Sequence, residues 1–256
     1  GDALTTGGSN VAVGKNALST EGIHGTNVAV GTNSLENLNA GAHGYNTAVG
    51  HDAGNDVTTG VRNTFIGGLA GDHTTDADRN IAIGFDALST NTVGSGSVAI
   101  GADALTTQNP ATATTMYNTA VGDAAGQSVT TGLRNTLLGG LAGDALTDAD
   151  DNVAIGSHAL SADTLGSQSV AIGQAALGDQ NFTTATNALN TAVGYNAGRS
   201  VTTGTANTLI GGVAGDALTT GINNTAVGVS ALSADTAGRF STALGNGALA
   251  LQNFST

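Results

Sequence analysis

The 256-residue chain lacks several residue types on which most domains depend. It contains no cysteine, no tryptophan, one proline, five phenylalanines and three tyrosines. Without cysteine there are no disulfides and no thiolate sites. A core of ordinary thickness relies on aromatic and large aliphatic side chains, each of which buries a large apolar area. We therefore expect a thin interior built mainly from alanine, valine and threonine.

Charge is also scarce, and most of it has one sign. Only 10% of residues are charged, with six Lys and Arg against 19 Asp and Glu, giving a net charge of −13. Such a chain cannot neutralise a run of phosphates, so nucleic acid is excluded as a partner, and an anionic membrane surface is disfavoured. No apolar run approaches the roughly 20 residues of a membrane span, so we expect no membrane insertion of this segment.

Glycine is abundant, with 40 residues, and it recurs at regular intervals. A motif of Asn or Ser, two further residues, an aliphatic residue and Gly occurs fourteen times, and most neighbouring copies are as far apart as Gly14 and Gly31, a spacing of 17. One spacing of 19 and two of 21 interrupt this pattern and create a longer super-repeat, seen as 46–117, 118–189 and an incomplete 190–256, with 1–45 as the end of a preceding one. A fixed period of this kind is typical of a solenoid. We expect residues 1–256 to be a single repeat segment of a longer fibre.

Each copy alternates polar, β-branched, small and aliphatic residues before the glycine, as in Asn190–Gly194. This alternation favours a strand, and the recurrent glycines would each cost a helix about 1 kcal/mol. A second extended piece, such as 200–204, follows in each copy. The predicted fold is all-β: a parallel β-solenoid whose coil has the length of the repeat and contains two short strands. The repeat positions that define it are represented by Asn46, Gly50, Asn118, Gly122, Asn190 and Gly194.

The strands are apolar on both faces, which predicts a homo-oligomer. The second and fourth motif residues share one face, the third residue lies on the other, and neither face carries much charge. One coil encloses only one interior, so the other face needs a partner. The third residue, usually Ala, is enlarged to Phe65, Leu137 and Leu209 once per super-repeat, and we expect these side chains to fill a seam between chains.

Several phrases resemble those of known fibre proteins. "SVAIGADAL" (97–105), "SVAIGQAAL" (169–177) and "NIAIGFDAL" (80–88) resemble the head repeats of trimeric autotransporter adhesins of the YadA type. "NTAVGYNAGRSVTTGTANTLIG" is similar to repeats in bacteriophage tail fibres. The resemblance implies a left-handed β-roll, a homotrimer and an extracellular location on a cell surface or virion. The 17-residue coil and the 72-residue super-repeat differ from the adhesin heads, so no collagen-binding site is carried over.

The predicted function is structural or adhesive: a rigid spacer or head in an extracellular fibre. The alternatives are a ligand-binding module and a self-assembling surface filament or sheath. Ice binding through the "VTTG" threonines ranks lower, because these pairs recur only about every fourth coil. No catalytic or nucleotide-binding motif is present, so we expect neither an enzyme nor a cofactor.

Longer connections once per super-repeat are the candidate binding loops, because loops on a rigid scaffold often carry recognition. Their amide and aromatic side chains could contact a host-surface glycan or a protein receptor; the alternative is that the aromatic packs back onto the roll. These residues are Gln108, Asn109, Pro110, Gln180, Asn181, Phe182, Gln252, Asn253 and Phe254.

Acidic turns and histidines are weaker candidates. The acidic turns could gather a calcium ion, although a solvated turn explains them equally simply, since a hard cation needs six or more converging oxygens. Their residues are Asp76, Asp78, Asp148, Asp150 and Asp151. The five histidines occupy non-equivalent repeat positions and are expected to be exposed turn residues.

Overall fold

The computed structural model describes residues 1–254. Within them the chain forms strands and turns and no helix. It divides into two compact units, Gly1–Thr131 and Gly132–Thr256, which are described one at a time. Both units are parallel β-solenoids in which each strand pairs with its equivalent one repeat later, as Thr47 does with Thr64 and Thr136 with Val153. The predicted fold class is therefore confirmed.

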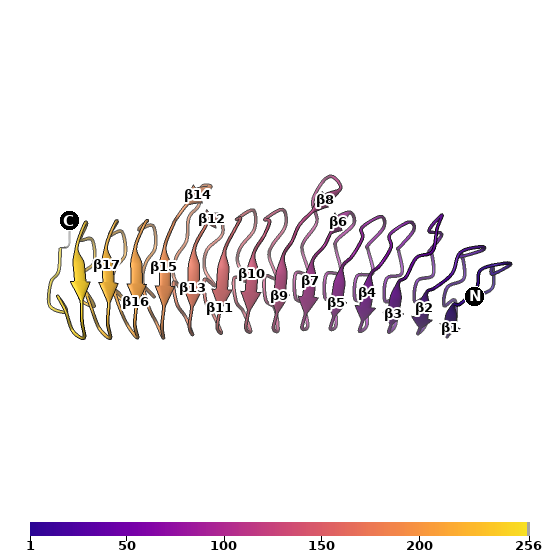
Figure 1. Ribbon diagram of the computed structural model, residues 1–256, viewed down its shortest axis with the longest axis horizontal. Coiled ribbons are helices and arrows are strands. Elements are labelled where there is room, and N and C mark those ends of the chain that lie inside the picture. Colours follow the sequence, from indigo (N-terminus) through magenta and orange to yellow (C-terminus); the bar gives the residue numbers. More distant parts are fainter. Residues whose placement is uncertain (255–256) are drawn as a thin grey trace. The chain divides into compact units, whose positions relative to one another are not determined.

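Unit 1 contains seven coils, and each contributes one three-residue strand to a parallel sheet (Figure 1). A separate two-stranded pair, β6 with β8, lies beside the longer connection, which extends beyond its neighbours in Figure 1. In sheet order the strands are β1 (Val11–Val13), β2 (Val28–Val30), β3 (Thr47–Val49), β4 (Thr64–Ile66), β5 (Ile81–Ile83), β7 (Val98–Ile100) and β9 (Thr119–Val121), and the pair is β6 (Gly94–Ser95) and β8 (Thr114–Thr115).

Unit 2 repeats this arrangement with seven more coils and the pair β12 and β14. In sheet order its strands are β10 (Thr136–Leu138), β11 (Val153–Ile155), β13 (Val170–Ile172), β15 (Thr191–Val193), β16 (Thr208–Ile210), β17 (Thr225–Val227) and β18 (Thr242–Leu244), and the pair is β12 (Gly166–Ser167) and β14 (Thr186–Asn187).

The second strand that the sequence predicted for every coil is missing from most of them, and residues 200–204, for example, form no strand. Paired strands form there only at β6–β8 and β12–β14, with one further bridge between Ile222 and Arg239, in the described part of the chain. Elsewhere this side is held by single backbone bonds, such as the one from the Arg79 N–H to the Val61 carbonyl at 3.0 Å. Arg79 has a φ of 57°, so the backbone bends there and cannot continue as a strand.

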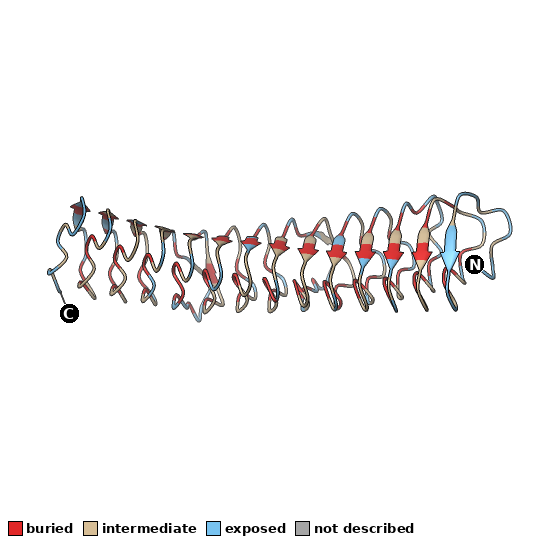
Figure 2. Ribbon diagram, turned by 90° about the horizontal axis from the view of Figure 1, so that it is seen from below, coloured by how far each residue is buried: buried red, intermediate tan, exposed pale blue. Residues whose placement is uncertain are grey.

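The pairing register sets repeat-equivalent residues directly against each other. Ala48 pairs with Phe65, and Phe65 pairs with Ala82, so every coil presents the same motif position inward. These middle residues are fully buried, whereas the residues on either side of them are half-buried or exposed (Figure 2). The strand therefore contributes one inward side chain per coil, which is alanine in most coils, as the composition predicted, and Phe65, Leu137 or Leu209 in the others.

Asparagine side chains connect successive coils. The Oδ1 of Asn46 accepts a bond from the backbone N–H of Asn63 at 2.9 Å, and its Nδ2 donates to the Gly60 carbonyl at 2.9 Å. The ladder predicted from the sequence is thus present, but it joins amide to backbone. Neighbouring ladder amides also bond directly to each other in unit 2, from Asn207 Nδ2 to Asn190 Oδ1 at 3.2 Å and from Asn224 Nδ2 to Asn207 Oδ1 at 3.1 Å.

Phe65, Leu137 and Leu209 do not fill a seam between chains, which corrects the sequence-based expectation. All three are fully buried inside their own coils. A Cβ added at Gly198 would lie 2.6 Å from Leu209 Cδ1, and one added at Gly215 would lie 2.7 Å from Leu209 Cδ2. The large strand residue occupies the space that two corner glycines leave empty.

The complementary arrangement occurs in the next coil. There the strand residue is Ala226 and the corner residue is Leu232, and both are fully buried. Leu232 has a φ of 56° and Gly215 a φ of 57°, so the corner backbone is the same in both coils. In successive coils the corner residue is Leu, Leu, Gly and Gly in turn. This order keeps the filled volume of the interior constant, because close-packed interiors tolerate neither overlap nor voids.

The motif glycine is required by close approach of the next coil. Gly194 has a φ of 139°, and a Cβ there would lie 2.6 Å from the carbonyl carbon and oxygen of Gly211. We expect Gly194→Ala to destabilise the fold by about 3 kcal/mol, from backbone strain and steric overlap. Gly212→Ala is the matched control, since a Cβ at Gly212 meets no atom within 4 Å. Thermal unfolding followed by circular dichroism measures both, and equal melting temperatures would contradict this account.

Volume exchange can be tested in the coil of β16. Leu209→Ala should cost about 2–5 kcal/mol through the cavity it leaves. Gly215→Leu alone should also destabilise, because its side chain overlaps Leu209. The double variant copies the Ala226 and Leu232 arrangement and should recover part of the loss. A double-mutant cycle in urea measures the coupling, and strictly additive losses would show that the two positions do not share one space.

Candidate functional site

The glutamines of the predicted binding loops lie in the interior, not on the surface. Gln180 is fully buried, its Nε2 donates to Asp163 Oδ2 and to Ser169 Oγ, and its Oε1 accepts from Asn190 Nδ2 at 2.8 Å. Asp163 is also fully buried and accepts from the backbone N–H of Gly166 at 3.0 Å. These groups form a polar layer inside the coil, so Gln180 is not accessible to a ligand.

The other two super-repeats contain related layers. Gln108 is fully buried and accepts from Ser97 Oγ at 3.1 Å and from Asn118 Nδ2 at 2.9 Å. Asn91 stands where Asp163 stands in unit 2, and Gln108 Nε2 has no acceptor in the described residues. Gln252 is half-buried and donates to Asp235 Oδ2 at 3.1 Å.

The aromatic and proline positions of the loops differ between super-repeats. Phe182 is 5% exposed and Pro110 is buried, so in these two loops the residue packs back onto the roll. Phe254 is exposed, and residues 255 and 256 of that stretch lie outside the described residues.

The asparagines of the loops are exposed, and each accepts a bond from a threonine of the preceding coil. The donors are Thr92 Oγ1 to Asn109 at 2.7 Å, Thr164 Oγ1 to Asn181 at 3.2 Å and Thr236 Oγ1 to Asn253 at 3.1 Å. The exposed part of the first two connections therefore includes their asparagines, the tips 111–113 and 183–185, and the side chains of Tyr117 and Leu189.

The aspartates of the acidic turns accept hydrogen bonds from neighbouring coils and do not converge on one point that a cation could occupy. Asp78 Oδ1 accepts the Val61 N–H at 2.8 Å, and Asp150 Oδ1 accepts the Leu133 N–H at 2.8 Å. Asp151 forms a bidentate pair with Arg134, which lowers the pKa of the Asp151 carboxyl.

The two remaining acidic candidates are engaged as well. Asp76 accepts from Thr59, and Asp148 also has a partner within the chain. In residues 1–254 no three His, Asp or Glu side chains are placed to hold a metal ion, so the calcium hypothesis gains no support.

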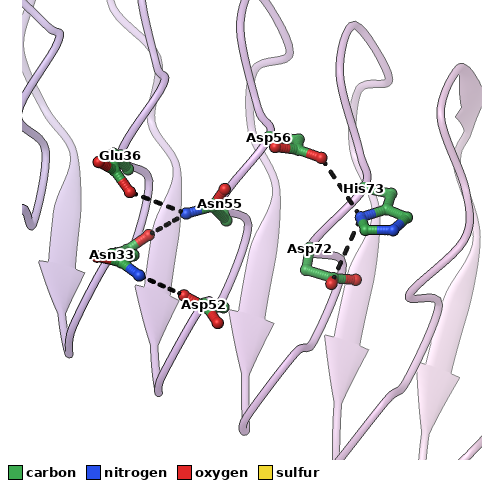
Figure 3. Close-up of a pocket in the computed structure, with 7 residues that line it drawn as sticks. All are labelled: Asn33, Glu36, Asp52, Asn55, Asp56, Asp72 and His73. Atoms are coloured by element: carbon green, nitrogen blue, oxygen red, sulfur yellow. Dashed lines mark hydrogen bonds and ion pairs between the residues drawn. The ribbon is translucent and has the colours of Figure 1, made fainter.

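One histidine does belong to a group, which the sequence reasoning missed. His73 Nδ1 lies 3.3 Å from Asp56 and 3.4 Å from Asp72, at one side of a hollow of about 360 Å³ in unit 1 (Figure 3). Asp56 and His73 are separated by one repeat period, so the period itself was the available signal. The hollow is lined by Asn33, Glu36, Asp52, Asn55, Asp56, Asp72 and His73.

The polar groups of this hollow are bonded to one another. Asn33 Nδ2 donates to Asp52 at 2.8 Å, and Asn55 Nδ2 donates to Glu36 and to the Asn33 carbonyl, each at 3.2 Å. Figure 3 shows these bonds running along the wall between adjacent coils. These bonds connect successive coils and strengthen their stacking.

Three aspartates at one repeat position are partly buried. Asp72, Asp144 and Asp216 each follow a corner glycine, and the Oδ1 of each is buried without a hydrogen-bond partner in the described residues. Burial raises the pKa of all three carboxyls, against the opposing charge of His73 at Asp72 and of His158 at Asp144. Their ionised forms therefore oppose folding at neutral pH.

We expect Asp144→Asn to stabilise the protein slightly at pH 7, by about 0.5 kcal/mol or less because solvent screens the half-exposed carboxyl. The folded-state pKa is raised, so the wild type loses stability as pH rises from the ordinary value of 3.8 through that raised value. The advantage of the variant should vanish as pH falls below about 4. Urea unfolding between pH 3.5 and 7.5 measures this.

Asp151→Asn is the control of opposite sign. The Arg134 pair depresses the Asp151 pKa, so its stabilising effect is present at neutral pH and is lost as pH falls through the folded pKa. Parallel pH profiles for the two variants would contradict the assignment.

The outer sheet face has no partner within the described part of its own chain. It consists of the second and fourth motif residues, which carry no charge in any coil. Ile81 is 37% exposed, and Leu138 is 46% exposed. In unit 1 its residues are Val11, Val13, Val28, Val30, Thr47, Val49, Thr64, Ile66, Ile81, Ile83, Val98, Ile100, Thr119 and Val121, and in unit 2 they are Thr136, Leu138, Val153, Ile155, Val170, Ile172, Thr191, Val193, Thr208, Ile210, Thr225, Val227, Thr242 and Leu244.

Opposite charges flank this face in unit 1. Arg62 and Arg79 precede successive strands, are exposed, and form no ion pair within residues 1–131. Asp86 and Asp103 follow successive strands at the other end. Burial and the neighbouring Asp103 charge raise the pKa of Asp86. These two arginines at one end and these two aspartates at the other are each one coil apart and have no counter-ion within residues 1–131.

No protein-family model matches the chain, and no curated protein matches it. In the described residues no helix has the length and apolar character that crossing a membrane requires.

Proposed function

We propose that the chain is a structural segment of an extracellular fibre whose copies associate through the outer sheet face. The observation that carries the proposal is that this face is uncharged in all seven coils of each unit, consists of Val, Ile, Leu and Thr, and is uncovered by its own chain. Parallel sheets are ordinarily covered on both faces. A second copy presents the same repeat at the same spacing and is the simplest cover.

The energy of such an interface grows with the number of coils. Covering a half-exposed valine or isoleucine gains about 1 kcal/mol. Eleven of the fourteen outer positions in unit 1 are Val or Ile, so the total is of the same order as the roughly 4–15 kcal/mol that association costs. Long arrays of coils should therefore associate, whereas short ones should not, which suits a fibre built by repetition.

The flanking charges favour a cyclic arrangement over a face-to-face dimer. In a cyclic oligomer one end of the strands meets the opposite end in the next copy. Arg62 and Arg79 would then approach the Asp86 and Asp103 ends of a neighbour, and both like-charge pairs would gain counter-ions. Three chains, as the resemblance to fibre repeats implies, is the smallest closed ring beyond a dimer.

The proposed task is mechanical. Within each unit, backbone and side-chain bonds join each coil to the next, and the connections at β8 and β14 extend beyond their neighbours (Figure 1). Such a segment would extend the fibre, resist proteolysis and separate a binding tip from its anchor. A surface filament or sheath would use the same interface.

Ice binding would use the same face in a different way. Thr191, Thr208 and Thr225 stack in successive coils of unit 2 on this flat, uncharged surface. An ice-binding face must remain free of other chains, so the oligomeric state separates the two functions.

Ile81→Lys and Ile155→Lys place a charge on the outer sheet face of each unit. We expect the wild type to sediment as a multiple of 24.7 kDa and the double variant to weaken association at least 100-fold, because a buried unpaired lysine is costly. Thr203→Lys, at an exposed position away from this face, is the charge-matched control. Sedimentation equilibrium measures all three.

A wild-type chain that stays at 24.7 kDa at high concentration would overturn the proposal. If that monomer also separates the freezing and melting points of ice, the outer sheet face binds ice instead.

A further inference from the structure

A second hollow, of about 340 Å³, lies on the corners of unit 2 that follow β11, β13 and β15. Its lining differs from that of the acidic hollow in unit 1, since it combines an aromatic ring with donors and acceptors of several kinds. The lining residues are His158, Ser161, Gln174, Ala175, Gly178, Asp179, Tyr195, Asn196 and Arg199.

The hollow arises from the small residues of its middle coil. Ala175 and Gly178 occupy repeat positions that Asn196 and Arg199 occupy in the following coil. The middle coil therefore has short side chains at these two positions, and the longer side chains of the coils on either side form the walls of the hollow. Backbone bonds hold these walls in place: the Asp179 N–H donates to the Arg199 carbonyl at 2.9 Å, and the Asn196 N–H donates to the Gln174 carbonyl at 3.0 Å.

His158 and Ser161 are hydrogen-bonded within residues 1–254, to Ser157 and to the Gly178 carbonyl, but the other polar side chains of the lining are not. The side chains of Gln174, Asp179, Asn196 and Arg199 make no hydrogen bond or ion pair in the described part of unit 2. Tyr195 is 58% exposed. In the acidic hollow of unit 1 the corresponding groups are bonded to one another, so free side chains are not a general property of these corners.

We propose that this hollow binds a neutral saccharide of one or two rings. Its volume is at the lower end of small-ligand sites. Sugar hydroxyls are both donors and acceptors, and they match a carboxylate acceptor at Asp179, a guanidinium donor at Arg199 and an amide at Asn196. The Tyr195 ring offers an apolar surface for the C–H face of a sugar.

The charges argue for a neutral ligand. Asp179 and Arg199 carry opposite charges, and the chain as a whole has a net charge of −13, which disfavours an anion. Asp179 is the only carboxylate in the lining, whereas glycoside hydrolysis ordinarily uses a pair. The hollow is accordingly a binding site without hydrolytic chemistry. This inference does not depend on self-association through the outer sheet face.

The test is calorimetric titration of the intact chain with glucose, galactose, mannose, N-acetylglucosamine and their β1,4- or α1,4-linked disaccharides. We expect saturable binding of at least one probe. Tyr195→Ala and Asp179→Asn should each weaken that binding at least 10-fold. Ala175→Asn with Gly178→Thr fills the hollow with residue types found at these positions in other coils, Asn196 and Thr106, and should abolish binding.

Phe85→Ala is the matched control. Phe85 occupies the repeat position of Tyr195 and is exposed, but the coil before it carries Leu69 and Asp72 in place of Ala175 and Gly178. Its loss should leave the affinity unchanged. Thermal unfolding of each variant checks that the coils are intact. Absence of saturable binding to every probe, or an affinity that survives both Tyr195→Ala and the filled hollow, would overturn the proposal.

Repeating the titration with Ile81→Lys, which lies in unit 1 and weakens association, separates the two proposals. Unchanged saccharide affinity in that variant supports a site contained within one chain, and loss of affinity there would refute it.

Discussion

The structure depends on the close, in-register contact of each coil with the next. At the motif glycine the backbones approach so closely that a methyl group at Gly194 would overlap the carbonyl of Gly211. The ladder asparagines satisfy backbone donors at the same level, as Asn46 does for Asn63. Because every coil supplies the bonding edge for its successor, one oversized residue at this contact disturbs two coils, and the regular period follows from that constraint.

Within this constraint, the residues that fill the interior vary from coil to coil: large and small side chains exchange places, and polar side chains replace apolar ones. Leu209 takes the space left by Gly198 and Gly215, and a coil with Leu232 at the corner returns to alanine on the strand. Once per super-repeat in unit 2, Asp163 and Gln180 replace apolar side chains and bond to each other inside the coil. A slip by one coil would separate these partners, so the buried polar layer opposes it.

The same geometry separates three kinds of surface. The strand residues that cannot turn inward form the outer sheet face, which we assign to self-association. The corner carboxylates and amides of unit 1 bond between coils and strengthen stacking. The corners of unit 2 after β13 carry small residues and leave Tyr195 and its polar neighbours unengaged, which makes this hollow the place where recognition is proposed.

The sequence by itself determined the all-β solenoid, its period and the asparagine and glycine ladders, because each repeats at a fixed spacing that local geometry can interpret. Its period would also have paired Asp56 with His73. Only the tertiary structure decided that Phe65 points into its own coil and that Gln108 and Gln180 are buried. Alternation shows which residues share a face of the strand, but it does not show which of the two faces points into the coil. A loop sequence likewise does not reveal which of its side chains the neighbouring coil will cover. The hollow beside Tyr195 likewise depends on the stacking of three coils, because small corner residues in the middle coil lie between larger ones in the coils before and after it.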